Sequence, residues 1–388
     1  MSNPTPVEPA STWIVTPRGD EAKTPLTRVF GLSAGERLER TLARHGAGPL
    51  RPWQPGLAGS ASGTSVVFRS DTFYDERLVQ ALLEADDALV FRDENSGEAL
   101  AACTHGDLDA AARALSEGRP SALPRVTPEN LVPSYNSQLR KFDPAFVFAA
   151  QPDQVAEAEK RIFSASYKGI TDFITKHVFP APALAVVRVL ARWGVRPNTV
   201  TAIGYGLTAA VIWLFARGDF GLGLLCAWTM TFLDTVDGKL ARVTLTSSRL
   251  GGFLDHALDL VHPPFWWWAF AVGLGIGQPD IELQMILIVG GYGVGRILEG
   301  IFLAAFGMEM FTWRPFDAFF RGIVARRNPN LLLLTAGWIV LAPGLGYLAV
   351  AGWTVACLAV ATVRVLQASA ARLAGQPIRP WHEEGLEH

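Results

Sequence analysis

The sequence has few cysteines and almost no net charge. The three cysteines, Cys103, Cys226 and Cys357, are odd in number, and their spacing matches no metal-binding pattern. We therefore expect reduced, buried thiols and no disulfide framework. Lysine and arginine (34) nearly balance aspartate and glutamate (36), which leaves a formal net charge of −2. A chain with so little excess charge is not expected to bind nucleic acid.

Long apolar runs are missing from about the first 160 residues. Residues 1–12 are polar and proline-containing, without the apolar core of a secretory signal peptide. Short apolar runs instead alternate with helical patterns, which is typical of an α/β sandwich with a largely parallel sheet. We predict a soluble α/β domain over residues 1–150, with strands over 11–15, 65–68, 88–92 and 99–103 and helices over 31–45 and 75–85. Residues 116–152 are rich in Pro, Ser and Asn and are expected to be irregular.

The rest of the chain is apolar and predicts an α-helical polytopic membrane domain over residues 198–370. Six segments have about the 20 residues that a spanning helix needs, and the last two are separated only by an expected Gly344-Leu345-Gly346 turn. A linker and a basic, interfacial amphipathic helix are expected over 151–197, and a tail over 371–388. The expected six transmembrane helices cover 199–216, 220–241, 255–276, 281–305, 330–347 and 348–368.

The positive charges between these segments predict an orientation. Arginine and lysine gather before the first span, between the second and third, between the fourth and fifth, and after the sixth. Because positively charged loops stay in the cytoplasm, both termini are expected on that side of a cytoplasmic (inner) membrane.

Four aspartates lie at the adjacent ends of the second and third apolar segments: Asp234, Asp237, Asp255 and Asp259. A carboxylate at the centre of a membrane helix costs roughly 2.5–3.5 kcal/mol, so such a cluster needs a compensating partner. Asp234 and Asp237 share one side of a helix, and Gly251, Asp255 and Asp259 repeat every four residues on a second helix. A turn over 243–250 would let the two stripes face each other. Oxygen ligands of this kind suit one or two Mg²⁺ or Mn²⁺ ions.

The pattern D-x2-D-G-x2-A-R-x8-G-x3-D-x3-D, filled at every fixed position from Asp234 to Asp259, resembles the signature of the CDP-alcohol phosphotransferases. The resemblance implies an integral membrane enzyme, a homodimer, that uses two Mg²⁺ or Mn²⁺ ions in phospholipid or related polar-lipid synthesis. It would move a substituted phosphate group from a CDP-alcohol (CDP-diacylglycerol or a CDP-polyol) to an acceptor alcohol or lipid and release CMP. The acidic site would lie on the cytoplasmic side.

The resemblance also implies roles for individual residues. All four aspartates would bind metal, and Asp259 would also be the general base. The segment Pro197-Asn198-Thr199-Val200-Thr201 resembles the family's P-N-x2-T entry to the first span. The CDP-binding residues would then be Asn198, Thr201, Asp237, Gly238, Ala241, Arg242 and Gly251.

Two candidate acceptor contacts are weaker. Arg296 lies inside the fourth span, where ionisable residues are suspected of function, and Lys168 lies in the basic segment before the first span. Arg296 also stands three residues before Glu299, so a simple mutual ion pair is an equal alternative.

Part of the first domain resembles a sugar-phosphate nucleotidyltransferase. Gly31 to Arg40 is similar to the helix after that family's nucleotide loop, and Val66 to Asp71 to its metal-binding strand end. The family's glycine-rich loop is replaced by Thr16 to Lys23, which holds a single glycine and Pro17. A degenerate domain is the favoured interpretation, and phosphate binding by Arg18 and Lys23 is the alternative.

Two other classes of function stay open for the membrane half. A UbiA-like prenyltransferase also combines aspartate-rich motifs, Mg²⁺ and a pyrophosphate, but its motifs lie far apart in sequence. A transporter with an acidic intramembrane site would show internal repeats or broken helices, and we find neither. The sequence does not name the donor alcohol or the acceptor.

Overall fold

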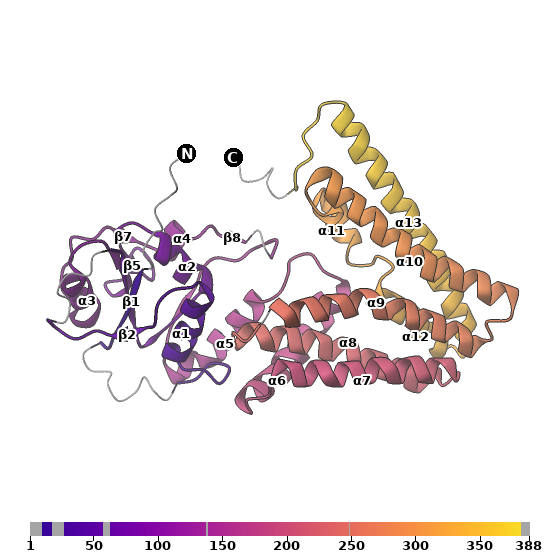
Figure 1. Cartoon of the computed structure of the whole chain (residues 1–388), viewed down its shortest axis with the longest axis horizontal. Coiled ribbons are helices and arrows are strands. Elements are labelled where there is room, and N and C mark those ends of the chain that lie inside the picture. The colour runs from indigo at the N-terminus through magenta and orange to yellow at the C-terminus, as the bar shows by residue number, and fades with distance from the viewer. Residues whose placement is uncertain (1–9, 18–26, 57–62, 137–138, 248, 382–388) are drawn as a thin grey trace. The chain divides into compact units, whose positions relative to one another are not determined.

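The chain forms two compact units, which a computed structural model describes over residues 10–17, 27–56, 63–136, 139–247 and 249–381 (Figure 1). For residues 249–251 and 253–259 only the backbone is described. The first unit contains Met1–Tyr167 together with two short later segments, Arg188–Gly194 and Arg242–Thr246. The second contains Lys168–Val187, Val195–Ala241 and Ser247–His388.

A six-stranded sheet in the order β2-β1-β3-β6-β5-β7 forms the centre of the first unit. Strand β1 pairs in parallel with β2 and β3, and β5 pairs in parallel with β7. Strand β6 runs antiparallel to both of its neighbours, β3 and β5. The strands are β1 (Ser11–Val15), β2 (Arg51–Pro52), β3 (Ser65–Arg69), β5 (Ala88–Phe91), β6 (Ala99–Thr104) and β7 (Arg125–Val126).

Helices cover both faces of this sheet because the central strands are buried on both sides. Alternate residues of β3 point to opposite faces: Val66 and Phe68 pack with α1 and α2, whereas Val67 packs with α3. These helices are α1 (Ala34–Arg44), α2 (Glu76–Glu84) and α3 (Leu108–Glu117), and α5 (Val155–Ala165) follows after a 3-10 turn, η2 (Pro152–Gln154). The predicted α/β domain is confirmed.

Two details of that prediction were wrong. The sheet is mixed, because β6 runs antiparallel between β3 and β5, and the direction of a strand is not encoded in its own apolar run. Residues 116–152 are not merely irregular. They contain β7, α4 (Pro128–Leu131), the β8–β9 pair (Tyr135–Asn136 with Lys141–Phe142) and β10 (Val147–Ala149), which pairs with β4 (Thr72–Tyr74).

Long helices make up most of the second unit (Figure 1). Helix α7 packs along α9, and α10 and α12 both pack on α13. A π-helical turn, η3 (Ile174–Val178), precedes α6 within the segment expected to be one interfacial helix. The helices are α6 (Pro180–Arg192), α7 (Pro197–Ala216), α8 (Phe220–Val243), α9 (Arg249–Leu274), α10 (Pro279–Phe306), η4 (Met310–Thr312), α11 (Pro315–Phe320), α12 (Arg327–Ile339) and α13 (Pro343–Leu373).

Three of these helices are long and apolar enough to cross a membrane, among the described residues: α7, α10 and α13. Only 33%, 17% and 22% of their most apolar windows are buried, so most of their apolar surface is left for lipid. Helices of this kind are typical of a membrane protein. The expected number of six spans goes beyond this finding.

The predicted boundary between the fifth and sixth spans was wrong. The helices separate at residues 340–342, not at Gly344-Leu345-Gly346, and α12 has 13 residues. Leu341 has a positive φ of 57°, and Pro343 begins α13, where its missing N–H costs nothing. Gly346 is instead a crossing point: a Cβ added to Gly337 would lie 2.5 Å from the Gly346 Cα.

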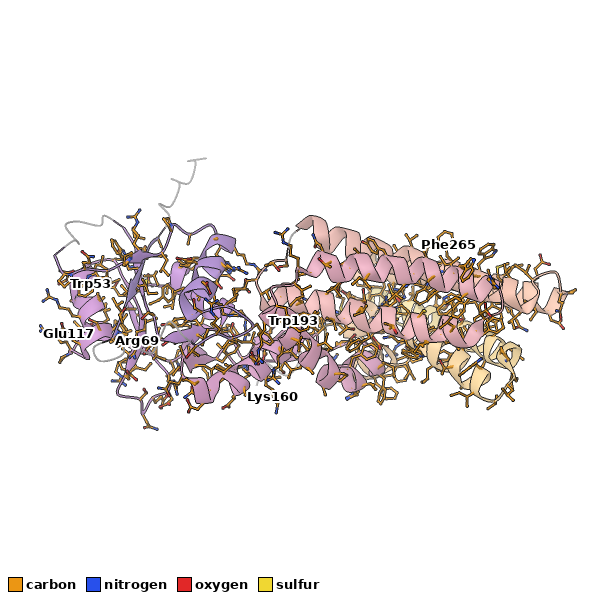
Figure 2. The ribbon with its side chains drawn as sticks, turned by 90° about the horizontal axis from the view of Figure 1, so that it is seen from below. Trp53, Arg69, Glu117, Lys160, Trp193 and Phe265 are labelled. Carbon is orange, nitrogen blue, oxygen red and sulfur yellow. The ribbon has the colours of Figure 1, made fainter. Side chains whose placement is uncertain are left out.

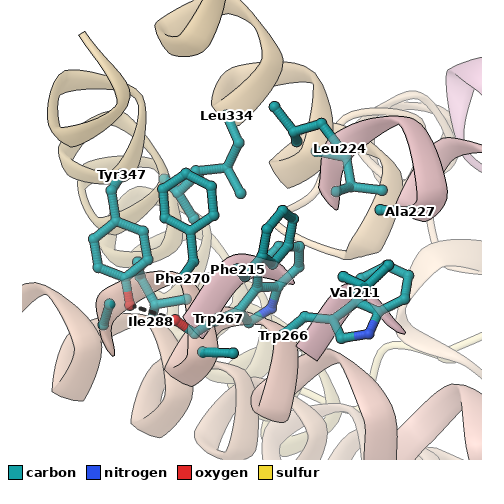
Figure 3. Packing of buried hydrophobic residues seen from close by; sticks show 14 of the residues in the cluster. Val211, Phe215, Leu224, Ala227, Trp266, Trp267, Phe270, Ile288, Leu334 and Tyr347 are labelled. Carbon is teal, nitrogen blue, oxygen red and sulfur yellow. Dashed lines mark hydrogen bonds between the residues drawn. The ribbon is translucent and has the colours of Figure 1, made fainter. Parts of the chain in front are cut away.

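Aromatic side chains fill the centre of the second unit (Figure 3). Phe270 of α9 stacks on Tyr347 of α13, and the Tyr347 hydroxyl donates to the Trp267 carbonyl at 2.9 Å. Trp266 and Trp267 are fully buried, whereas Phe265, labelled in Figure 2, and Trp268 are half exposed. This face of α9 therefore packs against protein, and the other is free for lipid.

We predict that Gly337→Val destabilises the protein by about 1–3 kcal/mol, the usual cost of overpacking a close contact. The added side chain has to push apart two helix backbones at the α12–α13 crossing. The measurement is the thermal unfolding midpoint of the purified protein in detergent. Gly352→Val is the matched control, because a Cβ on Gly352 of α13 meets no atom within 4 Å; an equal effect of both variants would contradict the prediction.

Candidate active site

Two aspartates project from the last turns of α8. Asp234 and Asp237 are three residues apart, so they lie on one side of the helix. Asp237 is buried, with 5% of its surface exposed, and Asp234 is partly buried. A buried carboxylate needs hydrogen bonds or an opposite charge.

Asp237 is held by the start of α7. The Thr201 hydroxyl donates to Asp237 Oδ2 at 2.6 Å, and Thr201 lies in the second turn of α7. The sequence placed Thr201 and Asp237 together as CDP-binding residues, and the structure brings them into direct contact.

Asp234 is paired with Arg327 of α12. Arg327 Nη2 donates to Asp234 Oδ2 at 2.6 Å, and both side chains are largely buried, with 16% and 17% exposed. Sequence reasoning missed this pair, because Arg327 was counted only as a loop charge that sets the orientation. Its place at the first residue of α12, beside an apolar run, is the signal that was available.

The other half of the motif lies on α9. Helix α8 ends at Val243 and α9 begins at Arg249, so the predicted helix–turn–helix is confirmed for the backbone. Gly251, Asp255 and Asp259 fall within α9, but their side chains lie outside the described residues.

Of the remaining predicted CDP contacts, Asn198 is exposed in the first turn of α7. A Cβ added to Gly238 would meet no heavy atom of the described residues within 4 Å, so there is open space beside this turn of α8. Ala241 is partly buried, and Arg242 Nη1 donates to the Ser166 carbonyl at 3.0 Å.

The residues of the motif suit a hard divalent cation. Asp234 and Asp237 supply carboxylate oxygens from consecutive turns of α8, and no described histidine or cysteine joins them. Such an oxygen-only set fits Mg²⁺ or Mn²⁺ better than zinc. No cluster of three metal-binding side chains occurs among the described residues, which hold only two of the four aspartates.

Arg296 belongs to a network of charged side chains around Glu299. Arg296 Nη2 donates to Glu299 Oε1, and Arg326 Nη2 donates to Glu299 Oε2 at 2.6 Å. The ion pair between Arg296 and Glu299 that the sequence allowed is therefore present. Lys168, the other candidate acceptor contact, is exposed.

Arg321 completes a group of three guanidinium groups in this region. Arg321 and Arg326 both lie against the Phe311 ring, at 5.7 and 5.5 Å from its centre. Burial, and then the neighbouring charge of Arg326, lower the pKa of Arg321 to about 9. Arg296 Nε, Arg321 Nη1 and Arg326 Nε are buried without hydrogen-bond partners among the described residues.

In the first unit, Asp71 does not resemble a metal ligand. Arg69 binds both of its carboxylate oxygens, Nε to Oδ1 at 2.9 Å and Nη2 to Oδ2 at 2.5 Å, and also contacts Glu98. Burial opposes the charged guanidinium, but its hydrogen bonds to Asp71 and Glu98 outweigh burial and raise the pKa of Arg69. This pairing supports the interpretation of a degenerate domain; Arg18 and Lys23 lie outside the described residues.

The apolar helices indicate a membrane protein, and the aspartates on α8 together with the helix–turn–helix give its helical unit an acidic site. Residues 194–324 match the family model of the CDP-alcohol phosphatidyltransferases. The C-terminal part of the chain therefore belongs to this family. No such assignment is made for the α/β domain.

Individual relatives match over shorter stretches. A phosphatidylinositol phosphate synthase of Streptomyces avermitilis is 39% identical over 90 residues, 23% of this chain and 35% of that protein. An archaetidylinositol phosphate synthase of Pyrococcus horikoshii is 31% identical over 113 residues, 29% of this chain and 58% of that protein. The chain thus spans between about a third and three fifths of the length of these relatives.

A solved structure of Mycobacterium tuberculosis phosphatidylinositol phosphate synthase with CDP-DAG bound is similar over 47% of this chain and 92% of the solved chain. Its sequence identity is 18% and its TM-score 0.38, a likeness too low to support an inference.

We predict that Thr201→Val weakens Mn²⁺ binding about tenfold, because residues that hydrogen-bond a metal ligand typically contribute this much to affinity. The valine has nearly the shape of threonine but cannot donate to Asp237. The measurement is a Mn²⁺ titration followed by electron paramagnetic resonance. Thr201→Ser keeps the hydroxyl and is the control; weakening of the same size in both variants would contradict a role for this hydrogen bond.

Proposed function

We propose that the protein is a CDP-alcohol phosphotransferase of polar-lipid synthesis, similar in its reaction to the phosphatidylinositol phosphate synthases. The donor is a CDP-alcohol, with CDP-diacylglycerol first among the candidates, and CMP is released. The observation that carries the proposal is the complete acidic motif on α8 and α9, with Asp237 fixed by Thr201 at the predicted nucleotide side.

In the proposed reaction, the acceptor hydroxyl attacks the β-phosphorus of the donor. A new P–O bond forms to the acceptor oxygen, the P–O bond to CMP breaks, and CMP leaves with the bonding electrons. Asp259 takes the hydroxyl proton. Thr201, Asn198 and the turn around Gly238 orient the nucleotide, so that the attacking and leaving oxygens are in line.

Asp234, Asp237, Asp255 and Asp259 would hold the divalent ions of this family. When bound, such ions neutralise the charge of the diphosphate and stabilise the leaving CMP. The protein's own contribution is to fix the carboxylates: Thr201 orients Asp237, and Arg327 orients Asp234 at the edge of the site.

We propose that the acceptor carries an anionic group, most simply a phosphate. Arg296, Arg321 and Arg326 bring three positive charges together, and Glu299 is the carboxylate that Arg296 and Arg326 share. The three buried N–H groups without partners would donate to phosphate oxygens, a geometry that guanidinium groups suit. An inositol phosphate, the acceptor class suggested by the names of the relatives, fits this requirement.

The proposed location is a cytoplasmic membrane, with the acidic site and both termini on the cytoplasmic side. Support comes from the arginines and lysines between the predicted spans. On that side, a water-soluble nucleotide and a membrane lipid both reach the ends of α8 and α9. A homodimer is proposed from the family alone.

The test of the proposed function is CMP release from CDP-diacylglycerol with Mg²⁺ and a panel of polyol and polyol phosphate acceptors. We expect release from the wild-type protein and loss of at least about a thousandfold in Asp259→Asn, because a general base contributes 10²–10⁴-fold and metal ligation adds to this. Binding of CDP-diacylglycerol should survive in the variant. Wild-type turnover by Asp259→Asn would disprove the assignment of the base, and no CMP release from any donor would disprove the function.

A second prediction concerns the acceptor. Arg326→Gln should raise the KM for a polyol phosphate about tenfold or more, the typical effect of removing one charged hydrogen bond, and leave the KM for the CDP-donor unchanged. Arg372→Gln is the control, since Arg372 lies at the end of α13 and contacts the Ala305 carbonyl. Equal changes in both KM values would show that the guanidinium cluster serves the fold and not the acceptor.

A further inference from the structure

The first unit includes two short segments that lie outside the α/β sequence. Arg188–Gly194 precedes the start of α7, and Arg242–Thr246 contains the end of α8 and the turn toward α9. These segments flank the residues expected to bind CDP: Asn198 and Thr201 follow the first, and Gly238 and Ala241 precede the second.

Helix α1 binds the second segment through two arginines. Arg37 Nη1 donates to the Val243 carbonyl at 2.7 Å, and Arg40 Nη1 donates to the Thr244 carbonyl at 2.7 Å. Carbonyls at the C-terminal end of a helix lack partners within the helix and carry its partial negative charge. Two guanidinium donors are thus well matched to the end of α8.

Helix α1 is a rigid base for these donors. Ser33 and Glu36 form a capping box at its start, with the Ser33 hydroxyl accepting from the Glu36 N–H and the Glu36 carboxylate accepting from the Ser33 N–H. Leu38 and Leu42 anchor the other face against the sheet. The side chain of Arg37 is buried, and this burial lowers its pKa to about 10.

The first segment is held through Glu159 of α5, a carboxylate that is only 2% exposed. It accepts from Arg188 Nε at 2.7 Å and from the Phe30 N–H at 3.4 Å. The backbone approaches closely here as well, since a Cβ added to Gly31 would lie 2.8 Å from the Ala191 carbonyl oxygen. Removing one partner of a buried carboxylate–arginine pair is costly, because the other charge is left buried and unpaired.

We propose that the α/β domain is a positioning domain for the donor site, and that Arg37, Arg40 and Glu159 are its positioning residues. By fixing the chain just before α7 and the chain at the end of α8, it sets the register in which Thr201 meets Asp237 and in which the turn leads into α9. This role rests on the proposed function, and it requires no nucleotide site in the α/β domain itself.

Arg40 offers the cleanest test because it is exposed and its removal spares the domain core. In the full-length protein in nanodiscs, Arg40→Ala should speed hydrogen exchange of the amides in residues 242–247. It should also raise the KM for the CDP-donor and weaken Mn²⁺ binding about fivefold each, less than the roughly tenfold or more that a direct hydrogen bond from a charged group contributes, because Arg40 acts through the backbone. The KM for the acceptor should not change.

Two further variants separate positioning from general stability. Arg40→Lys retains one donor and should recover most of the donor KM and the slow exchange. Arg113→Ala removes an arginine from α3 that pairs with Asp109 of its own helix, and should change none of the readouts.

The outcomes are distinct. If exchange at 242–247 is unchanged in Arg40→Ala, or if it rises while donor KM and Mn²⁺ affinity stay at the wild-type values, the positioning role is overturned. If the wild-type protein releases no CMP, the proposed function fails instead. The exchange and Mn²⁺ measurements need no turnover and still decide whether the α/β domain positions the acidic site.

Discussion

The cost of placing carboxylates on largely apolar helices is the constraint on which the helical unit depends. Each aspartate costs roughly 2.5–3.5 kcal/mol at the centre of a spanning helix, and a hydrogen bond from a charged group returns about 1.5–3 kcal/mol. The guanidinium of Arg327 offsets part of such a cost for Asp234, and the Thr201 hydroxyl donates to Asp237. The helical unit thus gives each of these two carboxylates a polar partner on a neighbouring helix.

These polar links also decide which helices meet. Apolar helices gain little from packing against each other in lipid, so small residues and polar contacts determine their arrangement. Thr201 and Arg327 bring α7 and α12 to α8, and Trp228 Nε1 adds a bond to Thr335 at 3.0 Å between α8 and α12. Glycines allow the closest approaches, as at Gly337 beside Gly346. Helix α8, which carries Asp234 and Asp237, is thus fixed by contacts near the motif itself.

The sequence predicted what depends on near neighbours along the chain. The spacing of Asp234 and Asp237 placed them on one helix face, and the polar residues after Arg242 marked the turn. The contacts that the sequence could not reveal join distant residues: Arg327 is 93 residues from Asp234, and Arg37 is 206 residues from Val243. The predicted turn at Gly344 and Gly346 was wrong for a related reason. A glycine suits a turn and a helix crossing equally, and only the partner helix distinguishes the two.

Two parts of the α/β domain resemble a nucleotidyltransferase, but the structure gives their charged groups other partners. The strand end that resembles a metal site holds Asp71 in a two-pronged ion pair with Arg69, so its charge is already neutralised. Helix α1, which resembles the helix after a nucleotide loop, directs Arg37 and Arg40 to backbone carbonyls. In both features the charged groups make internal contacts. Charged groups that make internal contacts in this way are suited to hold other segments of the chain in place.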